Sequence, residues 1–240
     1  MAALHPTPPF AELTYYPTSR WIRGTREGVT VIDSRHAVLV WEPGNMGPFY
    51  AFPAADVALA SPEDSDSLGL RYLDDPDLTG YVTLDWDALE RWYEEDEEVF
   101  FHPRDPFVRV DALHSSRHVR VERDGRRLAE SDAPILVFET GLPTRYYLPE
   151  DDIDGSVLAD SDLHTGCQYK GFASYRDVVL ETRRHPNLFW YYETPFAQVS
   201  EISGHLAPYS ERVDLVVDGE LQERPQGPLG RRAAPVRPAA

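Results

Sequence analysis

The feature that most constrains this chain is an internal repeat, because a repeat implies that one small fold occurs twice. In each half, an apolar segment ending in Glu leads through a turn to an aromatic segment, a proline, acidic residues and an aliphatic residue. The first occurrence spans residues 31–57 and the second spans residues 128–153. A further match aligns residues 80–90 with residues 204–214 without a gap. The order of these landmarks predicts two tandem copies of one domain.

The two copies differ in length between the landmarks. Val57 and Gly80 are separated by 22 residues, whereas Ile153 and Gly204 are separated by 50. The additional stretch of the second copy contains Cys167, and the first copy is therefore expected to be trimmed. We expect four parts: an N-terminal arm over residues 1–20, a first, trimmed repeat over 21–105, a second, complete repeat over 106–221 and a disordered tail over 222–240.

Periodicity and turn residues favour short strands. The 21 prolines and 15 glycines are spread through the chain, which is typical of strands separated by turns. A hairpin is expected at Asp124-Gly125, and strands are expected over residues 135–138, 145–148, 175–182 and 187–192. One helix is predicted from Thr194-Pro195 to Gly204, and residues 85–93 fit a helix or a strand. The expected fold class is mainly β, with few short helices.

Charge and composition exclude several classes of function. The chain carries 23 Lys and Arg against 41 Asp and Glu, a net charge of −18, so a phosphate backbone is repelled and no nucleic-acid partner is expected. No apolar run reaches the ~20 residues of a membrane span, and residues 1–10 lack the pattern of a signal peptide. We therefore expect a cytoplasmic protein without a membrane partner. A single cysteine excludes an intramolecular disulfide and a cysteine-rich zinc knuckle.

The single cysteine and the single lysine stand three residues apart. Lys170 is the only lysine among 23 basic residues, and the others are all arginine. In such a background an indifferent surface lysine is expected to have drifted to arginine. The segment 165–171, Thr-Gly-Cys-Gln-Tyr-Lys-Gly, is therefore the first candidate for a site.

This segment resembles part of a known bacterial family. Glu139 with the Tyr-Tyr-Leu-Pro run 146–149, followed by the Cys-x-Tyr-Lys-Gly motif 167–171 and Ala173-Ser174-Tyr175, is similar to the family called domain of unknown function 427. Residues 92–106 are similar to the segment that joins two such domains in tandem actinobacterial members. The resemblance spans about residues 20–221.

The resemblance implies two tandem β-tent-like (Mss4-like) domains, similar to the methionine sulfoxide reductase B group. This chain lacks the paired zinc cysteines of that group, so a structural zinc is not expected. The family also bears a nucleotidyltransferase label. The sequence shows neither a glycine-rich phosphate loop nor an aspartate pair on a strand that follows one, and it gives that label no support.

Four residues are candidates for catalysis: Cys167, Lys170, Glu139 and Tyr169. Cys167 is either an activated nucleophile or redox centre, or a small buried hydrophobe. Lys170 can form an imine, hold a carboxylate or phosphate, or lie on the surface. In a regular strand Lys170 points away from Cys167 and Tyr169, so one pocket can receive both only if Gly166 or Gly171 bends the chain.

Four further residues are candidates for ligand binding: Arg145, Tyr147, Tyr175 and Trp190. Together with neighbouring tyrosines they can line a pocket for a flat organic ligand, although ordinary β-core packing explains such a set more often. Arg145 shares a strand face with Tyr147 and can anchor an anion. Glu139 can act as a general acid or base, or pair with an arginine.

Metal binding has weaker support. His164 and Cys167 have a ligand-like spacing, with Asp162 or His185 available to complete a set, but two nearby ligands often arise by chance. No metal and no cofactor are therefore predicted.

The leading hypothesis is a small-molecule-binding protein, or an enzyme of unknown reaction, with its pocket in the second repeat around Cys167, Tyr169 and Lys170. Its partner is then a small organic ligand. The alternative is a non-enzymatic acidic interaction module. A concave site that joins Cys167 or Lys170 to Arg145 and the tyrosines favours the first hypothesis, and separate environments favour the second.

Overall fold

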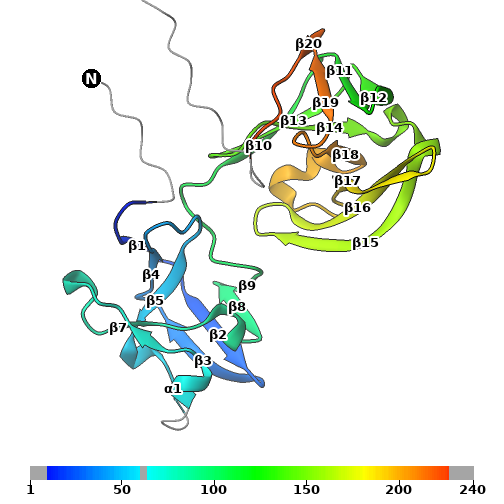
Figure 1. The fold of residues 1–240 in the computed structure, drawn as a ribbon. Coiled ribbons are helices and arrows are strands. Elements are labelled where there is room, and N and C mark those ends of the chain that lie inside the picture. The colour runs from blue at the N-terminus through cyan, green and yellow to red at the C-terminus, as the bar shows by residue number, and fades with distance from the viewer. Residues whose placement is uncertain (1–9, 60–63, 227–240) are drawn as a thin grey trace, which may run out of the picture. The chain divides into compact units, whose positions relative to one another are not determined.

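The computed structural model describes residues 10–59 and 64–226. The chain divides into two compact units, Met1–Pro106 and Phe107–Ala240, called unit 1 and unit 2 below. Each unit is mainly β and contains two antiparallel sheets (Figure 1). Each unit is described by itself.

Unit 1 contains a five-stranded sheet in the order β1-β4-β5-β7-β6 and a four-stranded sheet in the order β3-β2-β8-β9. Its helical segments are short. The strands are β1 (Thr14–Pro17), β2 (Ile22–Arg26), β3 (Val29–Ser34), β4 (Val38–Trp41), β5 (Phe49–Pro53), β6 (Arg71–Tyr72), β7 (Tyr81–Thr83), β8 (Arg91–Glu94) and β9 (Glu97–Val99). The helix α1 spans Asp64–Ser67, and the 3₁₀ helices are η1 (Ala54–Asp56), η2 (Pro76–Leu78) and η3 (Trp86–Ala88).

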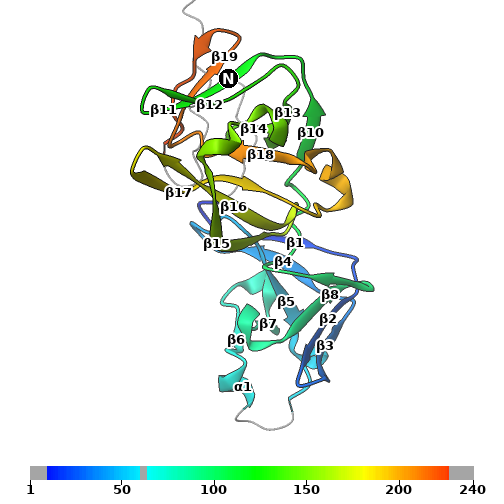
Figure 2. The same cartoon turned by 90° about the vertical axis from the view of Figure 1, so that its right-hand side faces the viewer.

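Unit 2 contains a seven-stranded sheet in the order β10-β13-β14-β18-β17-β16-β15 and a four-stranded sheet in the order β12-β11-β19-β20 (Figure 2). The strands are β10 (Val110–His114), β11 (Val119–Arg123), β12 (Arg126–Ser131), β13 (Ile135–Glu139), β14 (Arg145–Pro149), β15 (Leu158–Cys167), β16 (Gly171–Leu180), β17 (Arg183–Tyr191), β18 (His205–Pro208), β19 (Asp214–Val217) and β20 (Glu220–Leu221). The 3₁₀ helices are η4 (Glu150–Asp152), η5 (Gly155–Val157) and η6 (Ala197–Ile202).

The tight turns follow from residues that accept a positive φ. Asp124 and Gly125 have φ angles of 52° and 75° and connect β11 to β12, and two such residues suit the twist of a two-residue hairpin. The hairpin predicted at Asp124-Gly125 is therefore confirmed. Glu27 and Gly28 have φ angles of 51° and 73° and make the corresponding connection from β2 to β3 in unit 1.

Several backbone interactions occur in the same places in both units. In each unit the first hairpin has a register shift at its third residue pair and is joined by an isolated bridge to the residue after a 3₁₀ helix. The corresponding interactions are the bridges Ile32–Val57 and Ala129–Ile153, and the bonds from Ala54 N–H to Gly80 O and from Glu150 N–H to Gly204 O.

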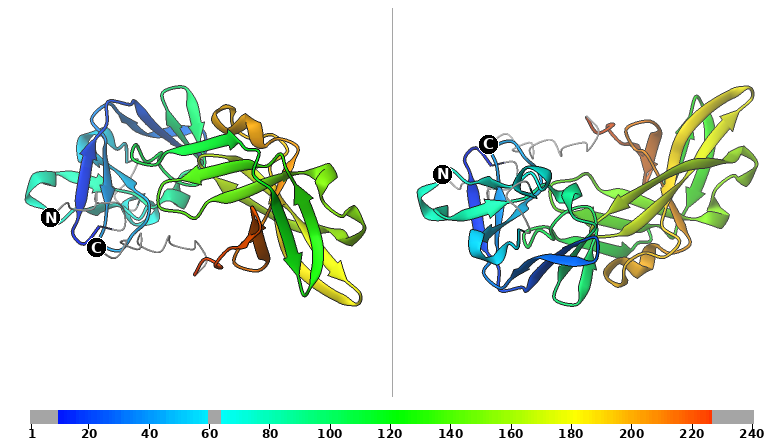
Figure 3. Two further views of the ribbon diagram at one scale, coloured as in Figure 1. Left: turned by 90° about the horizontal axis from the view of Figure 1, so that it is seen from above. Right: turned by 90° about the horizontal axis from the view of Figure 1, so that it is seen from below.

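The units differ between these shared interactions. Unit 1 has α1, β6 and η2 where unit 2 has the three long strands β15, β16 and β17, which form the extended hairpins seen in Figure 3. β15 is the outermost strand of its sheet, and its pairing with β16 shifts register between Asp160 and His164.

Unit 2 buries both faces of its seven-stranded sheet. Along β14, Tyr146 and Leu148 join the main core against the four-stranded sheet, whereas Tyr147 joins a second cluster on the opposite face. β17 alternates in the same way, with Phe189 in the main core and Trp190 in the second cluster. This alternation is the period of two of a β-strand, and η6 contributes Val199 to the second cluster.

The helix predicted from Thr194 to Gly204 is present only as a shorter helix of the 3₁₀ type. The segment forms the 3₁₀ helix η6, which is interrupted at Val199, where φ is −136° and ψ is 28°. The Pro and Gly boundaries leave too few residues for a stable α-helix, and burial of Val199 and Ile202 fixes the chain instead. Residues 85–93 divide between η3 and the start of β8.

None of the helices within residues 10–59 and 64–226 is long and apolar enough to cross a membrane. The predicted tail over 222–240 falls largely on residues 227–240, which lie outside the described residues. Residues 222–226 form no strand or helix beyond an isolated bridge position.

All strand pairs described for this chain lie within one unit or the other. Separate fragments of residues 1–106 and 107–240 therefore keep every strand pair, and we expect each to show β-type circular dichroism and a cooperative denaturation transition. A fragment that lacks dispersed amide signals in an NMR spectrum contradicts this expectation.

Candidate functional site

The segment Cys167–Gly171 forms a tight turn at the end of a long hairpin. β15 ends at Cys167 and β16 begins at Gly171, and these two residues pair directly. The Lys170 N–H donates to Cys167 O across 3.3 Å, and Lys170 O accepts from Phe196 N–H across 3.1 Å. Gly171 has a φ of +102°, a conformation that favours glycine. The chain thus bends at Gly171. Gly171 is one of the two glycines at which a bend is needed if Cys167 and Lys170 are to reach one pocket.

Lys170 forms a buried ion pair with Glu139, the last residue of β13. Nζ lies 2.5 Å from Oε2, and the two side chains are 10% and 13% exposed. Removing both charges from water costs free energy that the short contact only partly returns. Glu139 was expected to act in proton transfer or to pair with an arginine; its partner is the lysine.

A second ion pair joins Arg145 to Glu211. The Arg145 Nη1 and Nη2 atoms donate to the two oxygens of Glu211 across 2.9 and 2.7 Å, a bidentate geometry. The Arg145 guanidinium carbon also lies 5.5 Å from the ring centroid of Trp190. Because Glu211 occupies both of these donors, Arg145 can anchor a ligand anion only by exchanging partners.

Five aromatic residues surround these charges and are called the aromatic cluster: Tyr147, Tyr175, Trp190, Tyr192 and Tyr209. Trp190 Nε1 donates to Tyr147 Oη across 2.8 Å. Tyr175 and Tyr209 stack with centroids 6.4 Å apart and planes 10° from parallel. Thr165 Oγ1 lies 2.8 Å from Tyr175 Oη at the exposed edge of the cluster.

Burial controls the ionisation of the phenols. It raises the pKa of Tyr147 and of Tyr192 far above the usual value, and burial together with a hydrogen bond to Tyr175 raises the pKa of Tyr209. These three phenols stay protonated at neutral pH, so they act as hydrogen-bonding groups and not as bases.

Most of the predicted site residues lie on one face of the seven-stranded sheet. Cys167 is half-buried and packs against the second cluster together with Tyr147, Tyr175 and Trp190. Cys167 and Glu139 add to the raised pKa of the Tyr147 phenol, of which burial is the main cause. Arg145 and Lys170 reach the same surroundings through the contacts above.

Tyr169 is placed differently from the other predicted residues. It occupies the second corner of the turn, and its carbonyl accepts from Gln198 Nε2 across 3.1 Å. Two neighbouring tyrosines of the predicted set, Tyr146 and Tyr191, belong to the main core on the opposite face of the sheet.

Sequence reasoning missed Glu211 and Tyr209. Glu211 and Tyr209 follow β18, and only the pairing of β18 with β14 and β17 brings them to Arg145 and Trp190. Tyr209 shares the parity of the buried Ala207, which is a usable signal once the strand is known. Nothing in the local sequence identifies Glu211 as the partner of Arg145.

None of four cavities within the described residues of unit 2 is lined by Cys167, Tyr169 or Lys170. A cavity of about 230 Å³ is lined by Arg109, Asp111 and residues 138–142, and includes Glu139. A larger cavity of about 660 Å³ lies between β12 and η4, lined by residues 126–130 and 151–154. Glu139 thus links the smaller cavity to Lys170.

The histidines considered as metal ligands lie in different surroundings. His164 is exposed, with Nδ1 3.2 Å from Ser174 Oγ. His185 is buried near Asp124, and burial lowers its pKa. Within residues 10–59 and 64–226, no three His, Cys, Asp or Glu residues are grouped so that they could hold a metal ion.

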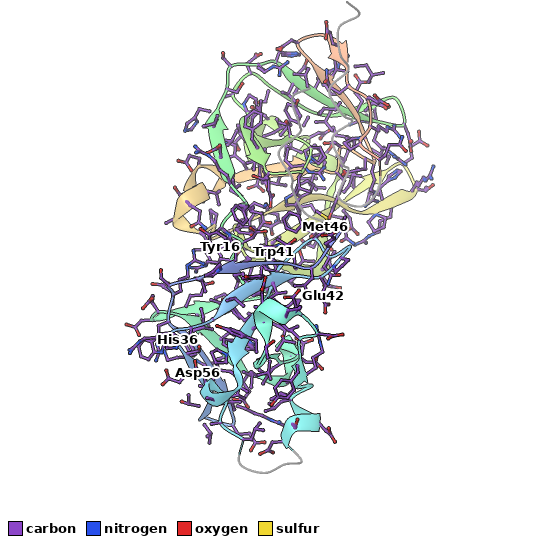
Figure 4. The ribbon with its side chains drawn as sticks, turned by 90° about the vertical axis from the view of Figure 1, so that its left-hand side faces the viewer. Tyr16, His36, Trp41, Glu42, Met46 and Asp56 are labelled. Carbon is purple, nitrogen blue, oxygen red and sulfur yellow. The ribbon has the colours of Figure 1, made fainter. Side chains whose placement is uncertain are left out.

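Unit 1 has a comparable ion pair in a different environment. Glu42, which is labelled in Figure 4, follows β4 as Glu139 ends β13. It pairs with Arg71 across 2.7 Å. Their side chains are 36% and 48% exposed. This exposed pair uses arginine, whereas its buried counterpart at Glu139 in unit 2 uses lysine.

Comparison with known proteins bears on unit 2. A family model described as "Domain of unknown function (DUF427)" matches residues 111–219. This range contains the Lys170–Glu139 and Arg145–Glu211 ion pairs and the aromatic cluster. It supports the family resemblance drawn from the motifs for these residues. No curated protein matches the chain.

The bend at Gly171 is open to direct test. A Cβ at this position has a strained φ and lies 3.4 Å from Thr194 O, so Gly171→Ala is expected to lower the unfolding free energy of unit 2 by about 1–3 kcal/mol. Gly155→Ala, where a Cβ meets nothing within 4 Å, is the matched control and should change it by less than about 0.5 kcal/mol. Equal effects in chemical denaturation contradict the role of this bend.

The buried phenols predict a pH dependence. Because the pKa of Tyr147 is raised in the folded state, its contribution to stability is complete below about pH 10 and is lost as the pH rises further. Above pH 10 the free energy of unfolding of the parent chain should fall with pH more steeply than that of Tyr147→Phe, by about 1 kcal/mol per pH unit. Urea denaturation between pH 9 and pH 11 measures this difference. Tyr72→Phe, at a 65% exposed position, should behave like the parent. A Tyr147→Phe variant with the parent's pH slope contradicts burial of this phenol.

Proposed function

We propose that unit 2 binds a small organic molecule, or acts on one, at the face that holds the Lys170–Glu139 pair and the aromatic cluster. The buried pair is the observation that carries this proposal. A buried ion pair contributes little to stability compared with an apolar pair of similar size. Its retention is therefore better explained by a role in binding or chemistry.

The identity of the cation supports the same conclusion. Lys170 is the only lysine in a chain with 22 arginines, and the exposed counterpart in unit 1 uses Arg71. Lysine offers a compact ammonium that can lose its proton, whereas the arginine side chain is a planar and permanently charged fork. A lysine at a buried position, in a chain whose other basic residues are all arginine, is consistent with an ammonium group that contacts a ligand.

The arrangement supplies several chemical capacities in one place. Glu139 can exchange a proton with Lys170 at a hydrogen-bond distance of 2.5 Å. Cys167 provides a thiol beside the aromatic cluster, and the protonated phenols can donate hydrogen bonds to a polar ligand. Tyr169 lies in the turn itself, between Cys167 and Gly171. Binding alone and turnover of the bound molecule both use these groups.

We propose that a ligand reaches the pair from the side of β13. The cavity of about 230 Å³ includes Glu139 and Gly141 in its lining. Clefts lined by a few polar groups and apolar walls are typical ligand sites. We propose this cavity as the access route to Lys170.

We also propose that the two units are tandem copies of one β-tent domain, as in the two-copy actinobacterial members of the family, in a cytoplasmic protein. The shared bridges, register shifts and backbone hydrogen bonds support a common origin. Unit 1 is then the trimmed copy, because it has no counterpart of the hairpin that carries Lys170 among its described residues.

The test is to identify small molecules that co-purify with the full chain by native mass spectrometry, and to compare variants at Lys170. We expect Lys170→Arg and Lys170→Ala to lower the affinity for the identified molecule at least about tenfold, because a hydrogen bond to a charged group is lost. Circular dichroism should show both variants folded.

Arg71→Lys is the matched control, because it changes the exposed pair of unit 1 by the reverse substitution. It should leave the bound molecule and its affinity unchanged. Unaltered binding by Lys170→Arg contradicts the proposal and favours the alternative of an acidic interaction module.

A further inference from the structure

Gln168 is buried where a turn residue is usually exposed. It is the first corner of the turn between Cys167 and Gly171, yet only 1% of its surface is accessible. Its Nε2 and Oε1 atoms are both buried, and neither has a hydrogen-bond partner among the protein groups that the structure describes. A buried amide without partners is unfavourable and needs a specific cause.

Gln168 differs from the other buried polar side chains that have an atom without a hydrogen bond. The arginines and the histidine in that group each lie within ion-pair distance of a carboxylate, and Ser210 has one buried hydroxyl oxygen without a partner. In Gln168 both ends of the amide lack a partner. The residue also stands between the two residues that define the candidate site, Cys167 and Lys170.

The charges around the site favour a neutral ligand. Lys170 is matched by Glu139, and Arg145 is matched by both oxygens of Glu211. An added anion has to displace one of these carboxylates. A neutral polar group can bind without breaking either pair.

We propose that Gln168 determines the specificity of this site and that the ligand carries a carboxamide-type group, such as a primary amide, a lactam or an imide. This inference rests on the proposed function of unit 2. A primary amide presents a donor and an acceptor side by side. It makes two parallel hydrogen bonds with a group that shows the complementary pair, as glutamine and asparagine do with adenine.

The aromatic cluster fits the rest of such a ligand. Trp190 and the tyrosines form a buried cluster against which Cys167, at the start of the turn, packs, and flat rings stack favourably on aromatic side chains. A ligand that combines a planar ring with a carboxamide edge therefore uses both the cluster and Gln168.

Benzamide and benzoate test this inference, because they share size and ring and differ in the polar group. With the full chain, isothermal titration calorimetry should show benzamide binding at least about tenfold more tightly than benzoate, since a carboxylate offers acceptors only. Gln168→Met should lower the affinity for benzamide at least about tenfold. Gln222→Met, far along the chain at the end of unit 2, should leave it unchanged.

A stability measurement separates recognition from a structural role. Because methionine has nearly the same shape and no amide to satisfy, Gln168→Met should raise the midpoint of thermal unfolding of the unliganded chain by about 2 °C or more. A lowered midpoint shows that the amide has a structural partner, such as an ordered water, and overturns the inference.

Two further results overturn it: equal affinity for benzamide and benzoate, and benzamide binding that survives Gln168→Met. If Lys170→Arg still abolishes binding of the co-purifying molecule in that case, the proposed function stands and only the assignment of Gln168 fails. If Lys170→Arg has no effect either, the proposed function fails with it.

Discussion

The buried contact between Lys170 and Glu139 is the constraint on which the site depends. Two opposite charges can share a desolvated position only if their atoms meet at short range, and here the distance is 2.5 Å. Glu139 reaches that position because β13 ends there. Lys170 reaches it because Gly171 turns the chain and Phe196 N–H holds the Lys170 carbonyl. The long hairpin, the left-handed glycine and η6 therefore serve one short contact.

The sequence predicted the parts of the fold that depend on local chemistry. Asp124-Gly125 marks its hairpin because both residues tolerate a positive φ, and the alternation along β14 correctly put Arg145 with Tyr147. It also identified Gly171 as one of two places where the chain had to bend. These features are governed by neighbouring residues, which is why one sequence is enough to find them.

Other features depend on distant partners and were missed. The predicted helix is interrupted at Val199, whose side chain is fully buried in unit 2. The residues that signal the start and end of a helix give no information about such burial. Glu211 pairs with Arg145 only because three strands align. The sequence grouped neighbouring tyrosines with Tyr147 and Trp190, but Tyr146 and Tyr191 pack on the opposite face of the sheet. The match of residues 111–219 to a family supports the resemblance but adds no contact.

The length of β15 has a consequence for the behaviour of the protein among other chains. β15 carries the turn to its position and forms one edge of the seven-stranded sheet, so its outer backbone groups have no strand partner among the described residues of unit 2. Unpaired backbone groups at a sheet edge can pair with a strand of another chain. Asp160 and Asp162 are exposed on this strand, and the pairing of β15 with β16 is irregular between Asp160 and His164. Such features discourage the docking of a foreign strand. In unit 1 the five-stranded sheet ends on one side in β6, which has only two residues, so that edge offers few backbone groups to another chain.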